Sequence, residues 1–471
     1  MKKQKKAFLL VYGCQMNFSD AERMAGELAS IGYERTDEMA AANLILINTC
    51  CVRESAEDRV YGKIGEIKHL KEANPRLIFG ITGCMAQKEG DALIARAPHI
   101  DFVLGTSKVR ELKTIVREIE AERGLVDTEI NHGARVTASV ANENGAKLRT
   151  ATRDKRGRFV DVTLTETELP DGGPVAREGK LSAWIPIMYG CNNFCTYCIV
   201  PYVRGRERSR RPEDIVREVE EAVANGYKEV TLLGQNVNSY GKDHKLADFA
   251  DLLKMVDEVH GIERVRFMTS HPKDLSDKLI ETIANGTHIC EHIHLPVQYG
   301  SDKILKAMHR IYTVDSYRAL AQRIRAAIPN VALTTDLIVG FPGETDEDFQ
   351  EMIAFLKEIR YDSAYTFIYS KRSGTPAATM EAQVPDALKH ERLNQLMAVQ
   401  NEISKEINDK LLDTVQEVMV EGPSKNDAAM WSGRTRTNKL VIFPHGTEQA
   451  GDFMNVKITH PQTWILKGEV V

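Results

Sequence analysis

Cys191-Asn-Asn-Phe-Cys195-Thr-Tyr-Cys198 is the stretch that decides how this 471-residue chain is interpreted. Its three cysteines lie within eight residues, in the spacing Cys-x3-Cys-x2-Cys. Three thiolates can hold a [4Fe–4S] cluster while one iron lacks a protein ligand. Zinc sites favour four ligands in paired Cys-x2-4-Cys units, so the triplet favours an iron–sulfur cluster over zinc or three incidental thiols. An iron without a protein ligand can bind a small molecule, which indicates a catalytic centre.

A series of alternating strands and helices surrounds this stretch. Strands are expected at Trp184–Met188, Glu229–Leu233, Val265–Thr269, His292–Val297, Val331–Val339 and Ala364–Tyr369. Helices are expected over 212–225, 247–259, 274–285, 301–328, 345–359 and 386–411. Because eight strands close a full barrel of this kind, six strands predict a partial (β/α)6 barrel over residues 179–409. Active sites of such barrels gather at the carboxyl ends of the strands, where the cysteine stretch falls.

The first part of the chain shows the same alternation. Strands are expected at Ala7–Tyr12, Leu44–Ile47, Leu77–Ile81 and Asp101–Leu104. The helix after the first of them is expected to begin at Ser19, because Ser19-Asp-Ala-Glu22 fits a capping box. The alternation predicts that residues 5–122 form an α/β domain, a doubly wound parallel sheet with helices on both faces.

A second set of cysteines follows the ends of these strands: Cys14, Cys50 and Cys84. Carboxyl ends of parallel strands share one edge of a sheet, so thiols 36 and 34 residues apart can converge there. Glycines at 13 and 83 would let the backbone approach closely. The shared position favours a second metal site over three ordinary buried cysteines. Cys51 is expected to face away, because neighbours in an extended segment point to opposite sides.

Two segments depart from the α/β pattern. Residues 123–178 are polar and rich in turn residues, which predicts a linker or insertion. Residues 410–471 alternate as short strands separated by Gly and Pro, which predicts a small antiparallel β-barrel. Its strands are expected at Val415–Val420, Thr437–Phe443, Phe453–Thr459 and Trp464–Val470.

Composition narrows the classes of function. Hydrophobic residues make up 42% and charged residues 27%, as in soluble globular proteins. No stretch approaches the ~18 apolar residues of a membrane helix, and no small-residue cleavage site follows Ala7–Tyr12, so a cytoplasmic protein without a membrane partner is expected. In that compartment the eight cysteines favour metal ligation over disulfides. The net charge of −5 means that any nucleic-acid surface must be local.

The cysteine stretch, with Tyr197 at the aromatic position of Cys-x3-Cys-x-aromatic-Cys, resembles the signature of radical S-adenosylmethionine enzymes. Combined with Cys14, Cys50 and Cys84 and with the C-terminal strands, it resembles the methylthiotransferase family over nearly the whole chain, 123–178 excepted. The motifs that resemble its tRNA-modifying branch are Gly13–Asn17, Asn48–Cys50, Val52–Glu54, Thr82–Gln87 and Gly190–Gly205. Gln15-Met16-Asn17 favours the isopentenyl-adenosine enzymes within that branch.

The resemblance implies two [4Fe–4S] clusters and two uses of S-adenosylmethionine. An auxiliary cluster would be held by Cys14, Cys50 and Cys84, and a core cluster by Cys191, Cys195 and Cys198. One S-adenosylmethionine would methylate sulfur at the auxiliary cluster. A second, in contact with Tyr197 and with Gly234, Gln235 and Asn236, would yield the radical that removes hydrogen from C2 of the adenine at tRNA position 37. The product would be 2-methylthio-N6-isopentenyladenosine.

The implied partners are the anticodon loop of tRNA, a reducing electron donor and a sulfur donor, with the chain acting as a monomer. A C-terminal TRAM domain would bind RNA. Arginine binds phosphate through bidentate hydrogen bonds, so the arginine-rich segment after the cysteine stretch is a candidate RNA contact rather than a solvated charge run. The candidates are Arg204, Arg206 and Arg208, and, beside Trp431 in the C-terminal barrel, Arg434 and Arg436.

Two other functions share these features. Methylthiotransferases that act on threonylcarbamoyl-adenosine in tRNA, or on a ribosomal-protein aspartate, are similar in the core. An RNA-binding protein that uses two clusters for electron transfer alone belongs to a different class. Cleavage of S-adenosylmethionine to 5′-deoxyadenosine would separate an enzyme from an electron carrier.

Overall fold

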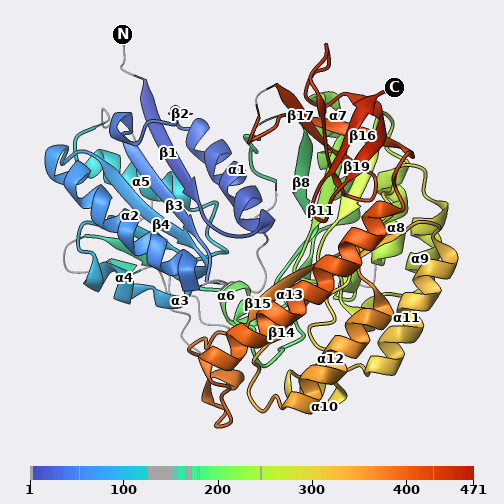
Figure 1. Cartoon of the computed structure of the whole chain (residues 1–471). Coiled ribbons are helices and arrows are strands. Elements are labelled where there is room, and N and C mark those ends of the chain that lie inside the picture. The colour runs from blue at the N-terminus through green and yellow to red at the C-terminus, as the bar shows by residue number, and fades with distance from the viewer. Residues whose placement is uncertain are drawn as a thin grey trace. The chain divides into compact units, whose positions relative to one another are not determined.

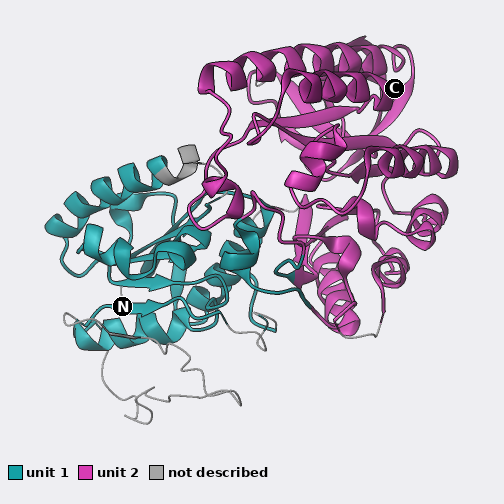
Figure 2. Cartoon of the chain, turned by 90° about the horizontal axis from the view of Figure 1, so that it is seen from below, with its two compact units in different colours: residues 1–178, 189–192, 199–208 teal, residues 179–188, 193–198, 209–471 magenta. Residues whose placement is uncertain are grey.

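The computed structural model describes residues 4–51, 54–125, 152–153, 157–164, 169, 172–177, 179, 181–243, 247–427 and 429–471. The chain divides into two compact units (Figure 2). Unit 1 comprises residues 1–178, 189–192 and 199–208, and unit 2 comprises residues 179–188, 193–198 and 209–471. The cysteine stretch is shared, because Cys191 belongs to unit 1 while Cys195 and Cys198 belong to unit 2. Three short elements lie on this segment: β9 (Met188–Tyr189), α6 (Val200–Arg204) and β10 (Arg208–Ser209).

Unit 1 is built on a seven-stranded sheet in the order β2-β1-β3-β4-β5-β7-β6 (Figure 1). The strands are β1 (Lys5–Val11), β2 (Tyr33–Arg35), β3 (Leu44–Thr49), β4 (Ile78–Gly83), β5 (Phe102–Leu104), β6 (Thr152–Arg153) and β7 (Phe159–Asp161). All pair in parallel except β6 with β7. Helices α1 (Gln15–Ala29) and α5 (Leu112–Glu122) cover one face, and α2 (Glu54–Ala73) and α4 (Asp91–Arg96) the other. The predicted doubly wound α/β fold is confirmed.

Two features of unit 1 differ from what the sequence predicts: the start of α1 and the structure of segment 123–178. α1 begins at Gln15 and not at Ser19, which is buried within the helix. Cys14 is the cap residue and makes no side-chain cap hydrogen bond, so no capping signal marks the true start. The segment 123–178, expected to be a linker or insertion, contributes β6 and β7 and extends the sheet past β5. Most of the remainder of that segment lies outside the described residues.

Unit 2 contains the predicted six-stranded partial barrel. Parallel strands form two sheets, β12-β11-β8 and β13-β14-β15, and an isolated parallel bridge joins Val265 to Ile289, three residues before the second sheet begins. The strands are β8 (Ser182–Pro186), β11 (Glu229–Leu233), β12 (Arg264–Phe267), β13 (His292–His294), β14 (Ala332–Val339) and β15 (Ser363–Ile368). The helices are α7 (Pro212–Ala224), α8 (Phe249–Asp257), α9 (Asp277–Asn285), α10 (Asp302–Ala307), α11 (Val314–Ala327), α12 (Asp346–Ile359) and α13 (Asp386–Asp409). The helix expected over 301–328 is divided by a turn, in which His309 has a φ of 58°.

The end of the chain forms a closed five-stranded barrel in the order β16-β17-β18-β20-β19. Its strands are β16 (Val415–Pro423), β17 (Met430–Thr435), β18 (Leu440–Pro444), β19 (Phe453–Pro461) and β20 (Leu466–Val470). Buried valine, isoleucine, leucine and phenylalanine side chains fill its interior. β17 has no counterpart among the strands that the sequence predicts, because Ser432-Gly433-Arg434 lacks an alternating apolar pattern.

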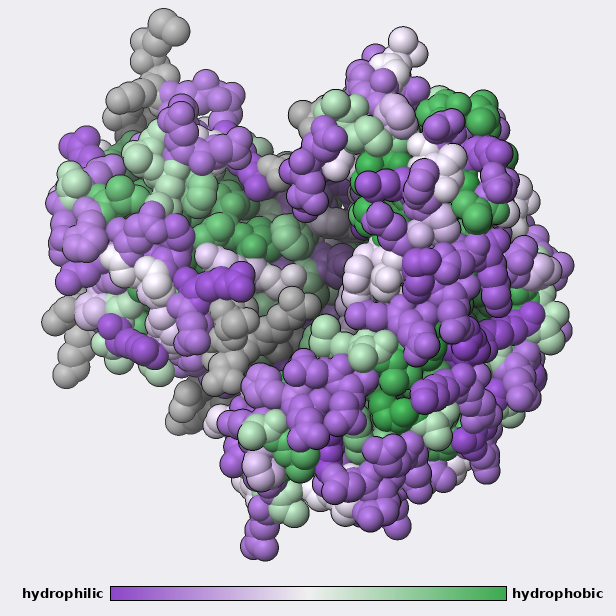
Figure 3. All heavy atoms as spheres, viewed as in Figure 1, coloured by the Kyte–Doolittle hydropathy of each residue, from purple (hydrophilic) through white to green (hydrophobic). Residues whose placement is uncertain are grey.

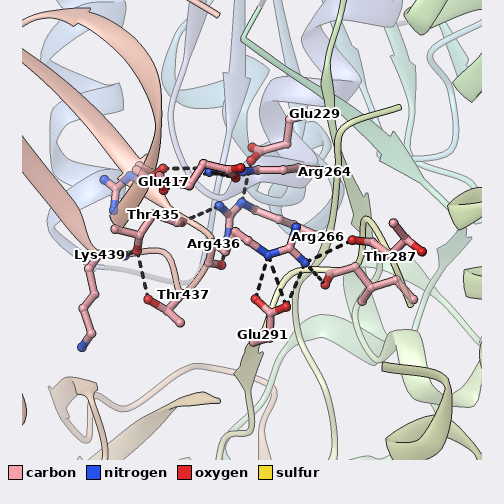
Figure 4. A network of polar contacts seen from close by, with 12 residues as sticks. Glu229, Arg264, Arg266, Thr287, Glu291, Glu417, Thr435, Arg436, Thr437 and Lys439 are labelled. Atoms are coloured by element: carbon pink, nitrogen blue, oxygen red, sulfur yellow. Dashed lines mark hydrogen bonds and ion pairs between the residues drawn. The ribbon is translucent and has the colours of Figure 1, made fainter. Parts of the chain in front are cut away.

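Two arginines of β12 attach this C-terminal barrel to the partial barrel (Figure 4). Arg264 and Arg266 donate hydrogen bonds of 2.7, 2.8 and 2.9 Å to the backbone carbonyl groups of residues 434–436. In the opposite direction, Arg436 donates to both carboxylate oxygens of Glu291, at 2.8 and 2.9 Å. Arg264 and Arg266 are buried, so the end of β17 is fixed to the amino-terminal end of β12.

Among the described residues, no helix is long and apolar enough to cross a membrane. On the face of the molecule in Figure 3, hydrophobic residues are interspersed with hydrophilic ones. The apolar side chains are instead gathered into separate buried clusters, two on the faces of the unit 1 sheet and one in each barrel of unit 2.

Candidate functional site

The cysteines of unit 1 lie beyond the ends of three neighbouring strands. Cys14 follows β1, Cys50 follows β3 and Cys84 begins α3 (Cys84–Glu89) after β4. Gly13 has a φ of 129°, and a Cβ there would lie 3.1 Å from the Cys50 sulfur. Gly83 has a φ of 92°, and a Cβ there would lie 2.3 Å from a backbone oxygen of β3. Both glycines therefore permit the close approach of the strand ends that the sequence predicts.

Arg204 of α6 lies at the same edge of unit 1. Its Nη2 donates to Asp20 Oδ2 at 2.9 Å, and the two side chains are 4% and 2% exposed. Close packing of protein atoms raises the pKa of the Cys14 thiol, which nonetheless reaches solvent, while the charge on Arg204 opposes that rise. Cys14 Sγ also donates to Asn17 Oδ1 at 3.3 Å. A guanidinium thus stands among thiols, which suits thiolate ligands.

The predicted orientation of Cys51 is wrong. Its thiol lies against that of Cys84, and this contact lowers the pKa of Cys84 to about 6; burial opposes the shift, and the charge on Arg204 adds to it. Both thiols are buried against Ile199 and Val203. β3 ends at Thr49, so Cys50 and Cys51 lie beyond the extended segment in which neighbouring side chains alternate.

In unit 2, Cys195 and Cys198 lie in a loop that is anchored through Thr196. The Thr196 N–H donates to Met308 O at 3.1 Å, and its hydroxyl donates to Ala307 O at 2.9 Å. The Cys198 N–H donates to Cys195 O at 2.9 Å and closes a tight turn. The end of α10 therefore fixes the part of the cysteine stretch that belongs to unit 2.

Arg310, just past α10, directs its guanidinium at this loop. Nη1 donates to Cys195 Sγ at 3.4 Å and Nε to the Tyr312 hydroxyl at 2.7 Å. Burial, followed by the proximity of Cys195, raises the pKa of Tyr197 well above its usual value. Burial, followed by the charge of Arg310, lowers the pKa of His271 to about 2, so His271 is neutral. Nothing in the sequence singles out Arg310, which lies 115 residues from Cys195.

The segment after β11 carries buried polar atoms that lack partners. Asn236 is 1% exposed, and its Nδ2 donates to Asp274 Oδ2 at 2.7 Å. Its Oδ1, the side-chain oxygen of Gln235 and both polar side-chain atoms of Asn238 have no hydrogen-bond partner in the described part of the chain. Unpaired buried polar atoms are costly, so they indicate a ligand at the carboxyl edge of the partial barrel. Gly234 also has a packing role, because a Cβ there would lie 2.7 Å from a methionine carbon.

The arginines expected to contact RNA have different surroundings. Arg206 is exposed, and half-buried Arg208 donates to the Arg204 carbonyl at 3.3 Å. Arg434 and Arg436 pair with glutamates of unit 2 at 3.1 and 2.8 Å. The expected position of Arg204 on an RNA-facing surface is wrong, because it is buried and paired with a carboxylate. A run of arginines looks the same in sequence whether each side chain points to water or to the interior.

The thiols suit iron–sulfur clusters through their chemistry. Within the described ranges, no group of three or more His, Cys, Asp or Glu side chains gathers as around a single metal ion. Each thiolate of a cluster binds a different iron, so the sulfurs need not converge on one point. Buried guanidinium groups beside thiols, one in each unit, fit the negative charge of a thiolate-ligated cluster.

Three family models match successive parts of the chain. Residues 6–105 match an uncharacterized protein family, UPF0004, residues 185–356 match the radical SAM superfamily, and residues 411–471 match the TRAM domain. Together with the cysteine loop after the first strand of a partial barrel, these matches define a radical S-adenosylmethionine protein with a C-terminal TRAM barrel.

Full-length relatives narrow that class. A tRNA-2-methylthio-N(6)-dimethylallyladenosine synthase of Carboxydothermus hydrogenoformans is 48% identical over 471 residues, covering 99% of this chain and 100% of the relative. A synthase of the same name from Desulfitobacterium hafniense is 49% identical over 468 residues, covering 99% and 97%. The chain belongs to the family of tRNA-2-methylthio-N(6)-dimethylallyladenosine synthases.

A solved structure shares the fold. The radical S-adenosylmethionine methyltransferase TsrM of Kitasatospora setae matches with a TM-score of 0.56 and 14% identity, over 80% of this chain and 74% of that chain. At this identity the likeness concerns the fold alone.

Proposed function

We propose that this chain methylthiolates C2 of N6-isopentenyladenosine at position 37 of tRNA, giving 2-methylthio-N6-isopentenyladenosine. The observation that carries the proposal is 48% identity over the full length to a synthase named for this product. The chain is a radical S-adenosylmethionine enzyme with two [4Fe–4S] clusters and tRNA as substrate. The substrate base contains no sulfur, so a sulfur donor is required, and reductive cleavage requires an electron donor. We further propose that the enzyme acts in the cytoplasm as a monomer.

We assign the auxiliary cluster to Cys14, Cys50 and Cys84, and the core cluster to Cys191, Cys195 and Cys198. When bound, the core cluster supplies the electron that cleaves S-adenosylmethionine reductively. The side chains of Gln235 and Asn236 offer buried acceptors to the bound S-adenosylmethionine, and Tyr197 packs beside Cys195.

The proposed RNA contacts are Arg206 and Arg208 in unit 1 and Arg434 and Arg436 in the TRAM barrel. Arg206 is exposed and suits a phosphate contact. Arg434 and Arg436 already bind glutamates, which compete with RNA for the guanidinium groups, so we expect them to contribute less.

Anaerobic reconstitution of the full chain, followed by nucleoside analysis of tRNA, tests the function. We expect about eight iron atoms per chain, 5′-deoxyadenosine formation, and a methylthio gain on isopentenyl-adenosine. 5′-Deoxyadenosine without modified tRNA would indicate another substrate, such as threonylcarbamoyl-adenosine or a ribosomal protein. Two intact clusters without S-adenosylmethionine cleavage would indicate an electron-transfer protein.

A further inference from the structure

Arg310 is a buried cation held in one orientation by three directed hydrogen bonds. Nε donates to the Tyr312 hydroxyl at 2.7 Å and Nη2 donates to Pro296 O at 2.7 Å. The remaining nitrogen, Nη1, donates to Cys195 Sγ at 3.4 Å. Arg310 is 7% exposed. The guanidinium plane is therefore fixed by two oxygen acceptors while one N–H group points at the sulfur.

The charge of Arg310 has no carboxylate partner among the described residues. Other buried arginines of unit 2 do have one: Arg210 with Glu218 at 2.8 Å, Arg266 with Glu229 at 2.7 Å and Arg392 with Glu344 at 2.8 Å. An isolated buried charge is strongly unfavourable, so proteins pair such charges. The acceptors of Arg310 are a carbonyl, a phenol and a thiol, and of these the thiol becomes an anion when it binds iron.

Hydrogen bonds to α10 fix both the loop that carries Cys195 and the backbone of Arg310. The loop residue next to Cys195, Thr196, is bonded twice to the end of α10, and the Arg310 N–H donates to Leu305 O of the same helix at 2.8 Å. The backbone at Arg310 and the loop beside Cys195 are therefore both held to the end of α10. The N–H···S contact is thus built into the local fold.

We infer that Arg310 is a positioning residue for the core cluster, whose guanidinium donates a hydrogen bond to the Cys195 thiolate and makes the reduction potential of that cluster less negative. The inference rests on the proposed function, through the assignment of Cys195 as a cluster ligand. Hydrogen bonds to cluster sulfurs are among the factors that set iron–sulfur potentials. A donor and a positive charge stabilise the reduced cluster, because reduction adds negative charge to the sulfur ligands.

Redox titration of the reconstituted full chain, followed by electron paramagnetic resonance, tests the inference. The core cluster is identified as the signal that disappears in a Cys191→Ala/Cys195→Ala/Cys198→Ala variant. In Arg310→Gln we expect the core potential to become more negative by about tenfold in the reduction equilibrium, or ~59 mV for one electron. The auxiliary potential should not change. Arg318→Gln is the matched control, because Arg318 belongs to the same unit but pairs with Asp315 and Glu358.

Arg310→Lys keeps the charge but loses the planar fork, so a smaller shift in the same direction is expected. If Arg310→Gln does not retain its core cluster, the core potential of Arg310→Lys serves as the test. An unchanged core potential in Arg310→Gln would overturn the inference, and so would an unchanged core potential in Arg310→Lys if Arg310→Gln loses its core cluster. Failure of the proposed function is distinguishable, since it would appear in the parent chain as missing clusters or unmodified tRNA.

Discussion

The auxiliary site of unit 1 and the cysteine loop of unit 2 each place a buried guanidinium beside thiols, but the two charges are balanced differently. Arg204 has a carboxylate partner, Asp20, at 2.9 Å. Arg310 has only a thiol and uncharged oxygens as acceptors within the described residues. The charge of the first arginine is balanced by a carboxylate, whereas the second would take its counter-charge from the Cys195 thiolate that we assign to the core cluster. We therefore expect the Arg204–Asp20 pair to contribute chiefly to the stability of unit 1, and Arg310 chiefly to the potential of the core cluster that we assign to Cys195.

Removing the core thiolates should have the largest effect and separate the two sites completely. Cys191→Ala/Cys195→Ala/Cys198→Ala should leave about half of the iron and abolish 5′-deoxyadenosine formation, because the remaining triplet holds only the auxiliary cluster. Iron analysis and chromatography of the reaction products measure both. Full iron retention in this variant would contradict the assignment.

Removing one auxiliary thiolate should have the opposite effect and impair only the auxiliary site. Cys50→Ala should lose the auxiliary iron and all methylthiolation, because a cluster with two protein ligands is poorly held. 5′-Deoxyadenosine should still form. Cys51→Ala is the matched control, since Cys51 is the neighbouring buried thiol and is not assigned as a ligand. If Cys51→Ala loses the auxiliary iron while Cys50→Ala retains it, the cluster ligand is Cys51 and not Cys50.

Disrupting the Arg204–Asp20 pair tests whether the fold depends on it. Asp20→Asn leaves a buried guanidinium without its counter-charge, so we expect unfolding free energy to fall by about 3 kcal/mol. Arg204→Met/Asp20→Leu removes both charges and should lose less. Denaturant titration of the iron-free full chain measures this. Equal stability of Asp20→Asn and the parent chain would show that the pair is not structural.

The smallest effect is expected at Arg206, two residues from Arg204 but exposed. Arg206→Gln should leave stability and cluster content unchanged. It should lower the slope of log affinity for tRNA against log salt concentration by about 0.7, the value for one phosphate contact on a single strand. Binding titrations at several salt concentrations measure the slope. An unchanged slope would remove Arg206 from the RNA surface.

The regular parts of the fold could be predicted because each strand carries its own apolar run. Glu229–Leu233 is a strand with the bounds that the sequence indicates, and the remaining five strands of the partial barrel fall close to theirs. β7 could not be found, since three residues in a polar segment become a strand only by pairing with β5. The start of α1 is also not predictable from the sequence, because its cap residue, Cys14, makes no side-chain cap hydrogen bond and so carries no capping signal.

The candidate site divides in the same way. The spacing of Cys191, Cys195 and Cys198 is visible locally, and strand-end positions locate the other triplet. The surroundings of the two arginines cannot be predicted from the sequence. Arg204 pairs with an aspartate 184 residues away, and Arg310 donates to a sulfur 115 residues away. Such pairings follow from tertiary packing rather than from any local pattern.

The attachment of the TRAM barrel determines how its part in the enzyme can be studied. Arg264 and Arg266 bind backbone carbonyl groups, which every residue type provides, so these three hydrogen bonds do not depend on which side chains follow β17. In β12, by contrast, the side chains matter, because the guanidinium groups of Arg264 and Arg266 are the donors of these hydrogen bonds. Ending the chain before Val415 would strip these buried donors of their acceptors. A shortened enzyme would therefore leave Arg264 and Arg266 without these acceptors as well as lacking the proposed RNA contacts of the barrel, so single substitutions on the barrel test those contacts more directly than truncation.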